Sequence, residues 1–125
     1  MKHSFPALAL LMALAGAATP RPVQAAEAVY DRQLIRLAEV LGSLQYLRAL
    51  CGEQNAPWRA RMEALLEAEK PDPDRRARMV AAFNHGYSAF EAVYRTCTPS
   101  AIAAINRYMK EGEELTTGIV ERYGR

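Results

Sequence analysis

The stretch AFNHGYSAFEAVYRTCTP, residues 82–99, contains the clearest folding signals of this chain. Its bulky apolar side chains recur at intervals of seven, four and three residues, at Phe83, Phe90, Tyr94 and Cys97. This spacing places them on one face of an α-helix. Thr98 and Pro99 then form an N-cap followed by a proline, which is typical of the start of another helix. The stretch therefore predicts one helix that ends at a cysteine and a second helix directly after it.

Apolar residues at intervals of three and four, bounded by glycine and proline, predict helices in the rest of the chain as well. The predicted helices cover approximately residues 28–50, 57–69, 73–97 and 99–123. Three of them are about 35 Å long at 1.5 Å per residue, whereas the second is only about 20 Å long. Short connections make consecutive helices antiparallel. The predicted fold is therefore all-α, an up-down-up-down four-helix bundle with a short second helix.

The chain has only two cysteines, and the predicted bundle brings them together. Cys51 follows the first helix and Cys97 ends the third, and in an up-down-up-down path these two ends lie at the same pole. Their spacing lacks the Cys-x-x-Cys pair of redox and zinc sites. We therefore predict one structural disulfide that staples the bundle. Closing a loop of this length would stabilise the fold by about 4 kcal/mol on the chain-entropy model.

Residues 1–25 have the features of a secretory signal peptide. A positively charged start precedes an apolar run at residues 7–18, which is too short to span a bilayer because a spanning helix needs about 20 residues. Val23 and Ala25 have the spacing that a signal peptidase reads. An uncleaved anchor is the alternative. We expect cleavage after Ala25, a mature helical bundle domain at residues 26–125, a periplasmic location and no transmembrane segment after cleavage.

The basic character of the chain comes from this leader. Of the 16 Lys and Arg residues, Lys2 and Arg21 precede the cleavage site, where no acid occurs, so the mature chain has 14 basic and 14 acidic residues. A neutral domain gives no electrostatic argument for nucleic acid. We expect no nucleic-acid partner and consider an envelope protein the candidate partner.

His85 is the single histidine of the mature chain and the obvious candidate for a catalytic base. A helical wheel places it about 140° from the apolar face that contains Phe83 and Phe90, so it should face solvent. A general base needs an orienting partner and a sheltered site, and neither is evident. The chain also lacks zinc spacing, Glu-x-x-His pairs, a nucleophile elbow and a glycine-rich phosphate loop. These observations predict no catalytic residue, no metal site and no cofactor.

The main apolar stripe of the first predicted helix contains Tyr30, Leu34, Leu37, Leu41 and Leu44, and the apolar face of the second contains Trp58, Met62, Leu65 and Leu66. The first helix also has a second line of apolar residues on the side away from its main stripe. The second line contains Ile35, Gly42, Tyr46 and Leu50. A helix that is apolar on two sides is either central in its bundle or exposed for a partner. Either the second or fourth helix covers this line, or Ile35, Tyr46 and Leu50 form a partner-binding surface. We expect partial cover, with Tyr46 the most exposed and its hydroxyl in water.

Two glycines, Gly86 and Gly112, fall on core faces at nearly the same level of the bundle. They either let helices approach closely or leave room for a small-ligand pocket with Tyr87, Tyr108 and His85 as its polar groups. The favoured function is a periplasmic, non-enzymatic helical module that binds a protein or another envelope component. The alternative is a small-ligand carrier or an enzyme with a pocket near Gly86 and Gly112.

Four segments, YLRALCG, AFNHGYSAFEAVYRTC, RYMKEG and VERYG, resemble in their order and spacing a family of small exported alphaproteobacterial proteins catalogued as a domain of unknown function. The resemblance covers the chain from Tyr30 to Gly124. It implies an envelope location and a paired role for Cys51 and Cys97. It implies no activity.

Overall fold

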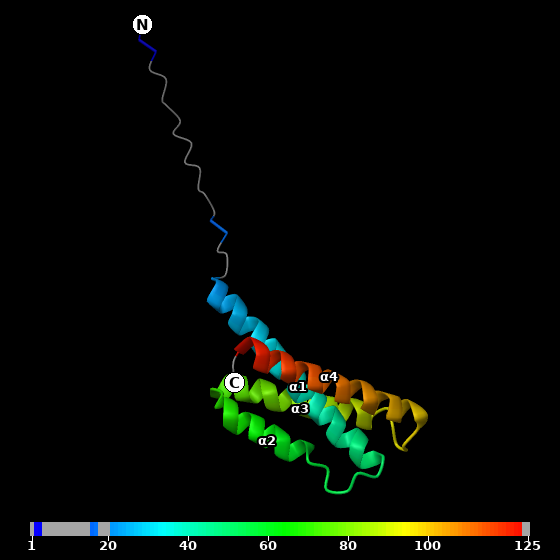
Figure 1. Ribbon diagram of the computed structural model, residues 1–125. Coiled ribbons are helices and arrows are strands. Elements are labelled where there is room, and N and C mark those ends of the chain that lie inside the picture. The colour runs from blue at the N-terminus through cyan, green and yellow to red at the C-terminus, as the bar shows by residue number, and fades with distance from the viewer. Residues whose placement is uncertain (1, 4–15, 18–20, 124–125) are drawn as a thin grey trace.

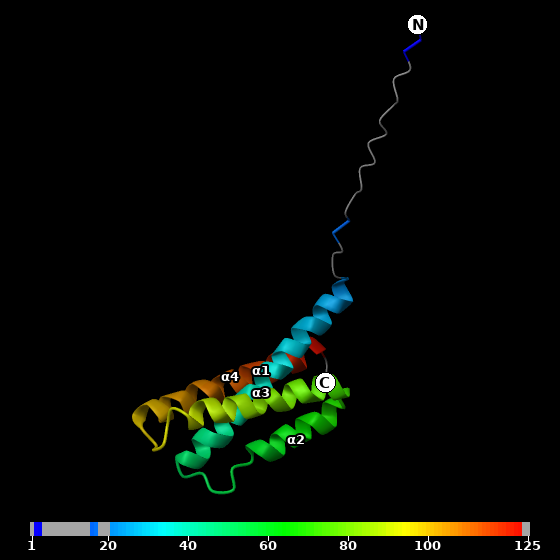
Figure 2. The same cartoon turned by 180° about the vertical axis from the view of Figure 1, so that it is seen from behind.

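The computed structural model describes residues 2–3, 16–17 and 21–123, which form four α-helices and no strand (Figures 1 and 2). The helices are α1 (Pro22–Leu50), α2 (Trp58–Glu69), α3 (Pro73–Glu91) and α4 (Pro99–Tyr123). Each helix runs opposite to the one before it, and α2 is the shortest. The predicted up-down-up-down four-helix bundle is confirmed.

Capping residues begin and end the helices where the sequence indicated. The Asp72 carboxylate accepts a hydrogen bond from the Arg75 N–H at 2.9 Å, and the Thr98 hydroxyl oxygen accepts one from the Ala101 N–H at 3.1 Å. Each bond satisfies an amide that the first helical turn leaves without a partner. Gly52 has a φ of 93°, the left-handed conformation that ends a helix.

The first helix begins earlier than residue 28, the predicted start. Pro22 is its first residue, a position that tolerates proline because the amide there has no helical acceptor. Residues 22–28 are exposed and extend beyond the bundle in both views. Most of the predicted signal peptide, residues 1–25, lies outside the described part of the chain. Cleavage after Ala25 would remove the first turn of α1 and leave its packed part intact.

The predicted continuation of the third helix to Cys97 is wrong, because α3 ends at Glu91. The Tyr46 hydroxyl of α1 donates a hydrogen bond to the backbone carbonyl of Tyr94. Residues 92–98 leave the helical path as the connection to α4, and this hydrogen bond holds the connection against α1.

The disulfide closes at the pole where the bundle brings Cys51 and Cys97 together. Their Cα atoms are 5.0 Å apart, and 46 positions separate them in the sequence. The predicted pairing is confirmed. It joins the end of α1 to the connection between α3 and α4.

The helix α1 is central, because it packs against each of the other three helices while those three hardly contact one another. The core residues that are most completely buried come from α1, α3 and α4 and include Leu34, Val40, Leu47, Met79, Ala101 and Ala104. The short helix α2 adds Trp58, Met62 and Leu66, which are slightly less buried. The two-sided apolar pattern of α1 therefore reflects its central place.

The tightest packing in the molecule is between α1 and α3. Gly42 of α1 and Gly86 of α3 lie where the two backbones touch, with Ser43 buried beside them. The Ser43 hydroxyl donates to the Glu39 carbonyl of its own helix at 2.9 Å, which satisfies the buried group.

Ion pairs and hydrogen bonds join the helices at other points. Arg36 of α1 donates to Glu111 of α4, with one N–O distance of 2.9 Å. This hydrogen bond raises the pKa of the Arg36 guanidinium, so the guanidinium stays positively charged. At the pole opposite the disulfide, Arg75 pairs with Asp31 at 2.9 Å.

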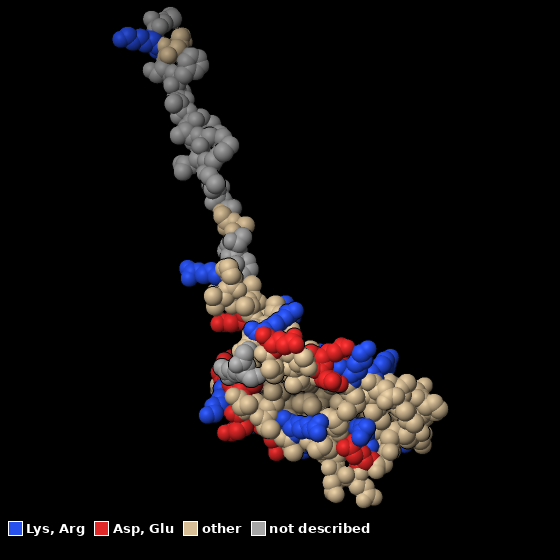
Figure 3. Space-filling view, viewed as in Figure 1, with Lys and Arg blue, Asp and Glu red and all other residues tan. Residues whose placement is uncertain are grey.

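The surface in Figure 3 carries charges of both signs without a large patch of either. The end of the molecule with the disulfide is almost free of charge in this view, and residues 96–106 contain no charged side chain. Within the described segments, no helix is both long enough and apolar enough to cross a membrane.

Candidate ligand-binding groove

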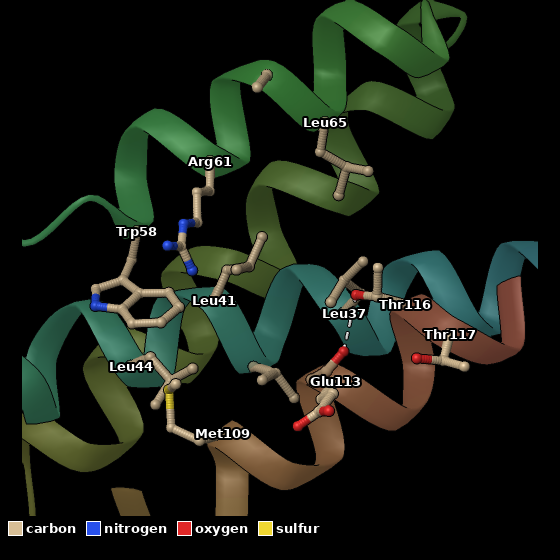
Figure 4. Close-up of a pocket in the computed structure, with 13 residues that line it drawn as sticks. Leu37, Leu41, Leu44, Trp58, Arg61, Leu65, Met109, Glu113, Thr116 and Thr117 are labelled. Carbon is tan, nitrogen blue, oxygen red and sulfur yellow. Dashed lines mark hydrogen bonds between the residues drawn. The ribbon is translucent and has the colours of Figure 1, made fainter. Parts of the chain in front are cut away.

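A groove with a volume of about 680 Å³ runs between α2 and α4 and has α1 as its floor. Apolar side chains form most of it, and a hollow is visible on this face of the space-filling view (Figures 3 and 4). The residues that line it are Leu37, Val40, Leu41, Leu44, Trp58, Arg61, Ala64, Leu65, Met109, Gly112, Glu113, Thr116 and Thr117.

The groove exists because α2 and α4 both pack on α1 without closing over it. Small side chains on the two walls, Ala64 on α2 and Gly112 on α4, leave the space between them unfilled. A Cβ built on Gly112 would touch only the Val40 side chain, at 3.4 Å. A helix wall with larger residues at these positions would fill part of the groove.

The floor of the groove belongs to the packed core of the bundle. The side chains of Leu37 and Leu41 are only 9% and 8% exposed, and that of Leu44 is 2% exposed, although all three line the groove. Trp58, at one end, is 4% exposed. The floor is therefore apolar and well packed.

A few polar groups line the walls. The guanidinium of Arg61 lies 4.5 Å from the centre of the Trp58 ring, within the range of a cation–π contact. Figure 4 shows Arg61 reaching from α2 to a place between Trp58 and Leu41. Within residues 21–123, Arg61 forms no ion pair.

The opposite wall, α4, contributes one acid and two hydroxyls. The carboxylate of Glu113 stays beside its own helix in Figure 4. Thr116 donates its hydroxyl proton to the Gly112 carbonyl at 2.8 Å, and Thr117 lies next to it along the helix. The groove therefore combines an apolar floor with one cation and one acid on facing walls. No residue of this lining pairs a nucleophile with a base, so the arrangement suits binding.

The three candidate partner-binding residues lie elsewhere. Ile35, Tyr46 and Leu50 are half-buried, and the first two pack against the core. The Tyr46 ring makes an edge contact with Tyr87 of α3 at 5.3 Å between centroids. The helix that covers Tyr46 is thus α3, where the second or fourth helix was expected. The prediction that the Tyr46 hydroxyl lies in water is wrong, because it bonds the Tyr94 carbonyl.

The two glycines of the predicted pocket lie in different surroundings. A Cβ on Gly86 would be 2.1 Å from the Glu39 carbonyl oxygen, so the backbone of α1 fills that space. Gly112 lines the groove, but Tyr87, Tyr108 and His85 do not. His85 is exposed, as its wheel position predicted. In the part of the chain that the structure describes, no three His, Cys, Asp or Glu side chains gather as metal ligands would.

Sequence reasoning missed most of the groove. It assigned Leu37, Leu41 and Leu44 to the core and Trp58 to the apolar face of the second helix, which their burial confirms, but it did not show that one side of them stays open. The signal that could have indicated a gap was the pair of small residues on the walls, Ala64 of α2 and Gly112 of α4. Of these two residues, only Gly112 was predicted to lie at a possible pocket.

A central helix, one disulfide and an open apolar groove define this protein as a small disulfide-stapled helical bundle. Residues 29–123, which span all four helices, match the model of a family described as "Protein of unknown function (DUF2385)", and the chain belongs to that family. The predicted resemblance to a family of unknown function is confirmed. No curated protein and no solved structure is detectably similar to the chain.

Proposed function

We propose that this protein is an exported, non-enzymatic binding domain of the periplasm and that the groove between α2 and α4 is its binding site. The observation that carries the proposal is the open apolar furrow over α1. Its volume of about 680 Å³ lies within the range of about 300–1,000 Å³ that is usual for ligand sites. Such sites are mainly apolar with a few polar groups that orient the ligand, and this groove has that composition.

The groove supports binding of an envelope component better than it supports catalysis. The polar side chains of its lining are limited to Arg61, Glu113 and two threonines. The polar groups expected for an enzyme, Tyr87, Tyr108 and His85, lie outside it. Of the alternative functions, a small-ligand carrier is therefore the better supported.

Two features support a periplasmic location. The first is the predicted leader with its cleavage site after Ala25. The second is the Cys51–Cys97 disulfide, since such bonds persist in oxidising compartments such as the periplasm.

The test is a titration of the mature protein with N-phenyl-1-naphthylamine, a neutral apolar fluorophore. Because Trp58 is the only tryptophan and lines the groove, energy transfer from Trp58 to the bound probe reports binding at this site. We expect saturable transfer. Ala64→Leu, which adds volume to an exposed position on the groove wall, should weaken binding about tenfold or more, a loss of about 1.4 kcal/mol.

The matched control is Ala60→Leu. Ala60 is exposed on the same helix but does not line the groove, so this variant should bind the probe like the wild type. Absence of saturable transfer in the wild type, or equal binding by the Ala64→Leu variant, would show that the groove is not a binding site.

A further inference from the structure

We infer that the ligand of the groove is a single-chain amphiphile with a singly charged anionic headgroup, whose alkyl chain lies along the leucines of α1 and whose headgroup binds Arg61. This inference rests on the proposed function, because it names the ligand class of the same site. A fatty-acid carboxylate and the phosphodiester of a lysophospholipid share this chemistry.

The volume of the groove selects a small apolar occupant. An α-helix with its side chains is about 10–12 Å across, so two turns of it occupy about 1,000 Å³. The groove holds about 680 Å³, and leucines of α1 form its floor. An alkyl chain therefore fits the groove better than a helix of a partner protein.

The position of Arg61 selects an anionic headgroup. Its guanidinium lies over the face of Trp58 and beside Leu41, at the edge of the apolar floor. The stacking contact holds the planar guanidinium in place, and its N–H groups remain available to an oxygen pair. A guanidinium binds carboxylates and phosphates through two parallel hydrogen bonds. A ligand that fills the groove thus meets a fixed cation where its chain ends.

Glu113 on the facing wall limits the charge of the headgroup. It is the one acid among the lining residues, and it is exposed on α4. Because the repulsion by this carboxylate grows with the charge of the anion, a singly charged headgroup held by Arg61 meets about half the repulsion that a doubly charged one would meet. A cationic amphiphile would have to place its headgroup against Glu113 and bring a like charge near Arg61.

The experiment compares four ligands that share a twelve-carbon chain, each used below its micelle-forming concentration. They are dodecanoate, a dodecanoyl lysophosphatidylglycerol, 1-dodecanol and dodecyltrimethylammonium. Trp58 fluorescence reports binding of all four. We expect dodecanoate, the lysophospholipid or both to bind about tenfold or more tightly than dodecanol, and dodecyltrimethylammonium to bind least. The stronger of the two anionic ligands identifies the headgroup.

Arg61→Gln should remove the preference, so that the preferred anion and dodecanol bind this variant with similar affinities. Arg59→Gln is the matched control. Arg59 is also an exposed arginine of α2 stacked on an aromatic ring, that of Phe83, but it does not line the groove. This variant should keep the preference for the anion.

A measurement on the wild type tests the contribution of the Arg61 charge without any variant. Raising the salt concentration from about 0.01 M to 0.5 M should weaken anion binding and leave dodecanol binding unchanged, since salt screens the exposed charge of Arg61. Equal affinities for dodecanol and both anions, or tighter binding of the cation, would overturn the inference and leave the groove as an apolar site. If none of the four ligands binds, the proposed function of the groove as a binding site is wrong.

Discussion

Gly42 of α1 and Gly86 of α3 hold the two helices in backbone contact. A Cβ added to Gly42 would lie 1.9 Å from the Phe83 carbonyl oxygen, and one added to Gly86 would lie 2.1 Å from the Glu39 carbonyl oxygen. Real side chains never approach backbone atoms so closely, so any larger residue must push the helices apart. The two glycines thus fix the distance at which α3 covers α1.

Gly42→Ala and Gly86→Ala should each lower the free energy of unfolding by about 1–3 kcal/mol, the usual cost of overpacking. This loss exceeds the gain of about 1 kcal/mol that alanine brings to a helix. Gly118→Ala is the control, because a Cβ at Gly118 meets no atom within 4 Å and the helical gain should raise the melting temperature. Thermal unfolding followed by circular dichroism measures all three. Stabilisation by Gly42→Ala would contradict the close contact.

The disulfide should contribute a large share of the stability. Replacing Cys51 and Cys97 together by serine should lower the free energy of unfolding by about 4 kcal/mol on the chain-entropy model. Chemical denaturation measures the loss, and the wild type under reducing conditions should match the variant. Free alkylation of both thiols in the unreduced native protein would be the opposite result.

The hydrogen bond from Tyr46 to the Tyr94 carbonyl should stabilise the end of α3. Tyr46→Phe removes only the hydroxyl and should cost about 1 kcal/mol of unfolding free energy, since the carbonyl loses its partner. Tyr87→Phe is the matched control: it changes the ring that packs against Tyr46, and its hydroxyl makes no hydrogen bond in the described part of the chain. Equal melting temperatures of the two variants would mean that the bond contributes nothing.

Partner binding through Ile35, Tyr46 and Leu50 remains a prediction. Because α3 packs over Tyr46, truncation there should first reduce stability. Tyr46→Ala and Leu50→Ala are assayed for melting temperature and for capture of envelope proteins by the mature domain. Loss of captured proteins at an unchanged melting temperature would make this line an interface. Loss of stability alone would assign it to the packing of α1 against α3.

His85→Ala should change the free energy of unfolding by no more than about 0.5 kcal/mol, because the side chain is exposed and surface substitutions are usually that small. Ligand binding in the groove should be unaffected as well, since His85 does not line it. Calorimetric melting and the Trp58 titration check both expectations. A variant that folds normally but does not function in the cell would indicate that His85 has an active-site role.

The predicted leader should be absent from the exported protein. Cleavage after Ala25 leaves a chain that begins at Ala26 and keeps the packed part of α1. Intact-mass measurement of the protein from the envelope fraction tests this directly. A full-length mass in that fraction would indicate an uncleaved anchor.

Local chemistry made much of the fold predictable. The caps at Asp72 and Thr98 and the left-handed Gly52 act through neighbouring residues, so their effect can be read from short segments. The pairing of Cys51 with Cys97 followed from helix order alone, because antiparallel helices of similar length bring alternate ends to one pole. The main apolar stripe of α1 likewise predicted its buried leucines.

The end of α3 could not be predicted in the same way. The apolar spacing of Phe90, Tyr94 and Cys97 is compatible with a helix through all three. The helix nevertheless ends at Glu91, and the connection that follows is held against α1 by the bond from Tyr46 to the Tyr94 carbonyl and by the disulfide of Cys97. Contacts between segments almost 50 positions apart leave no signal in the local pattern.

By itself the sequence determined that α1 has two apolar faces, that four helices follow one another and that two cysteines meet. Only the tertiary structure decided which face another helix covers and which stays open. Gly42 lets the backbone of α3 close over the weaker line, whereas α2 and α4 stand apart over the stronger leucine stripe and leave a groove. The physical reason is that periodicity reports burial of a side chain, while an open furrow depends on the distance between two walls, and that distance is set by packing among helices far apart in the chain.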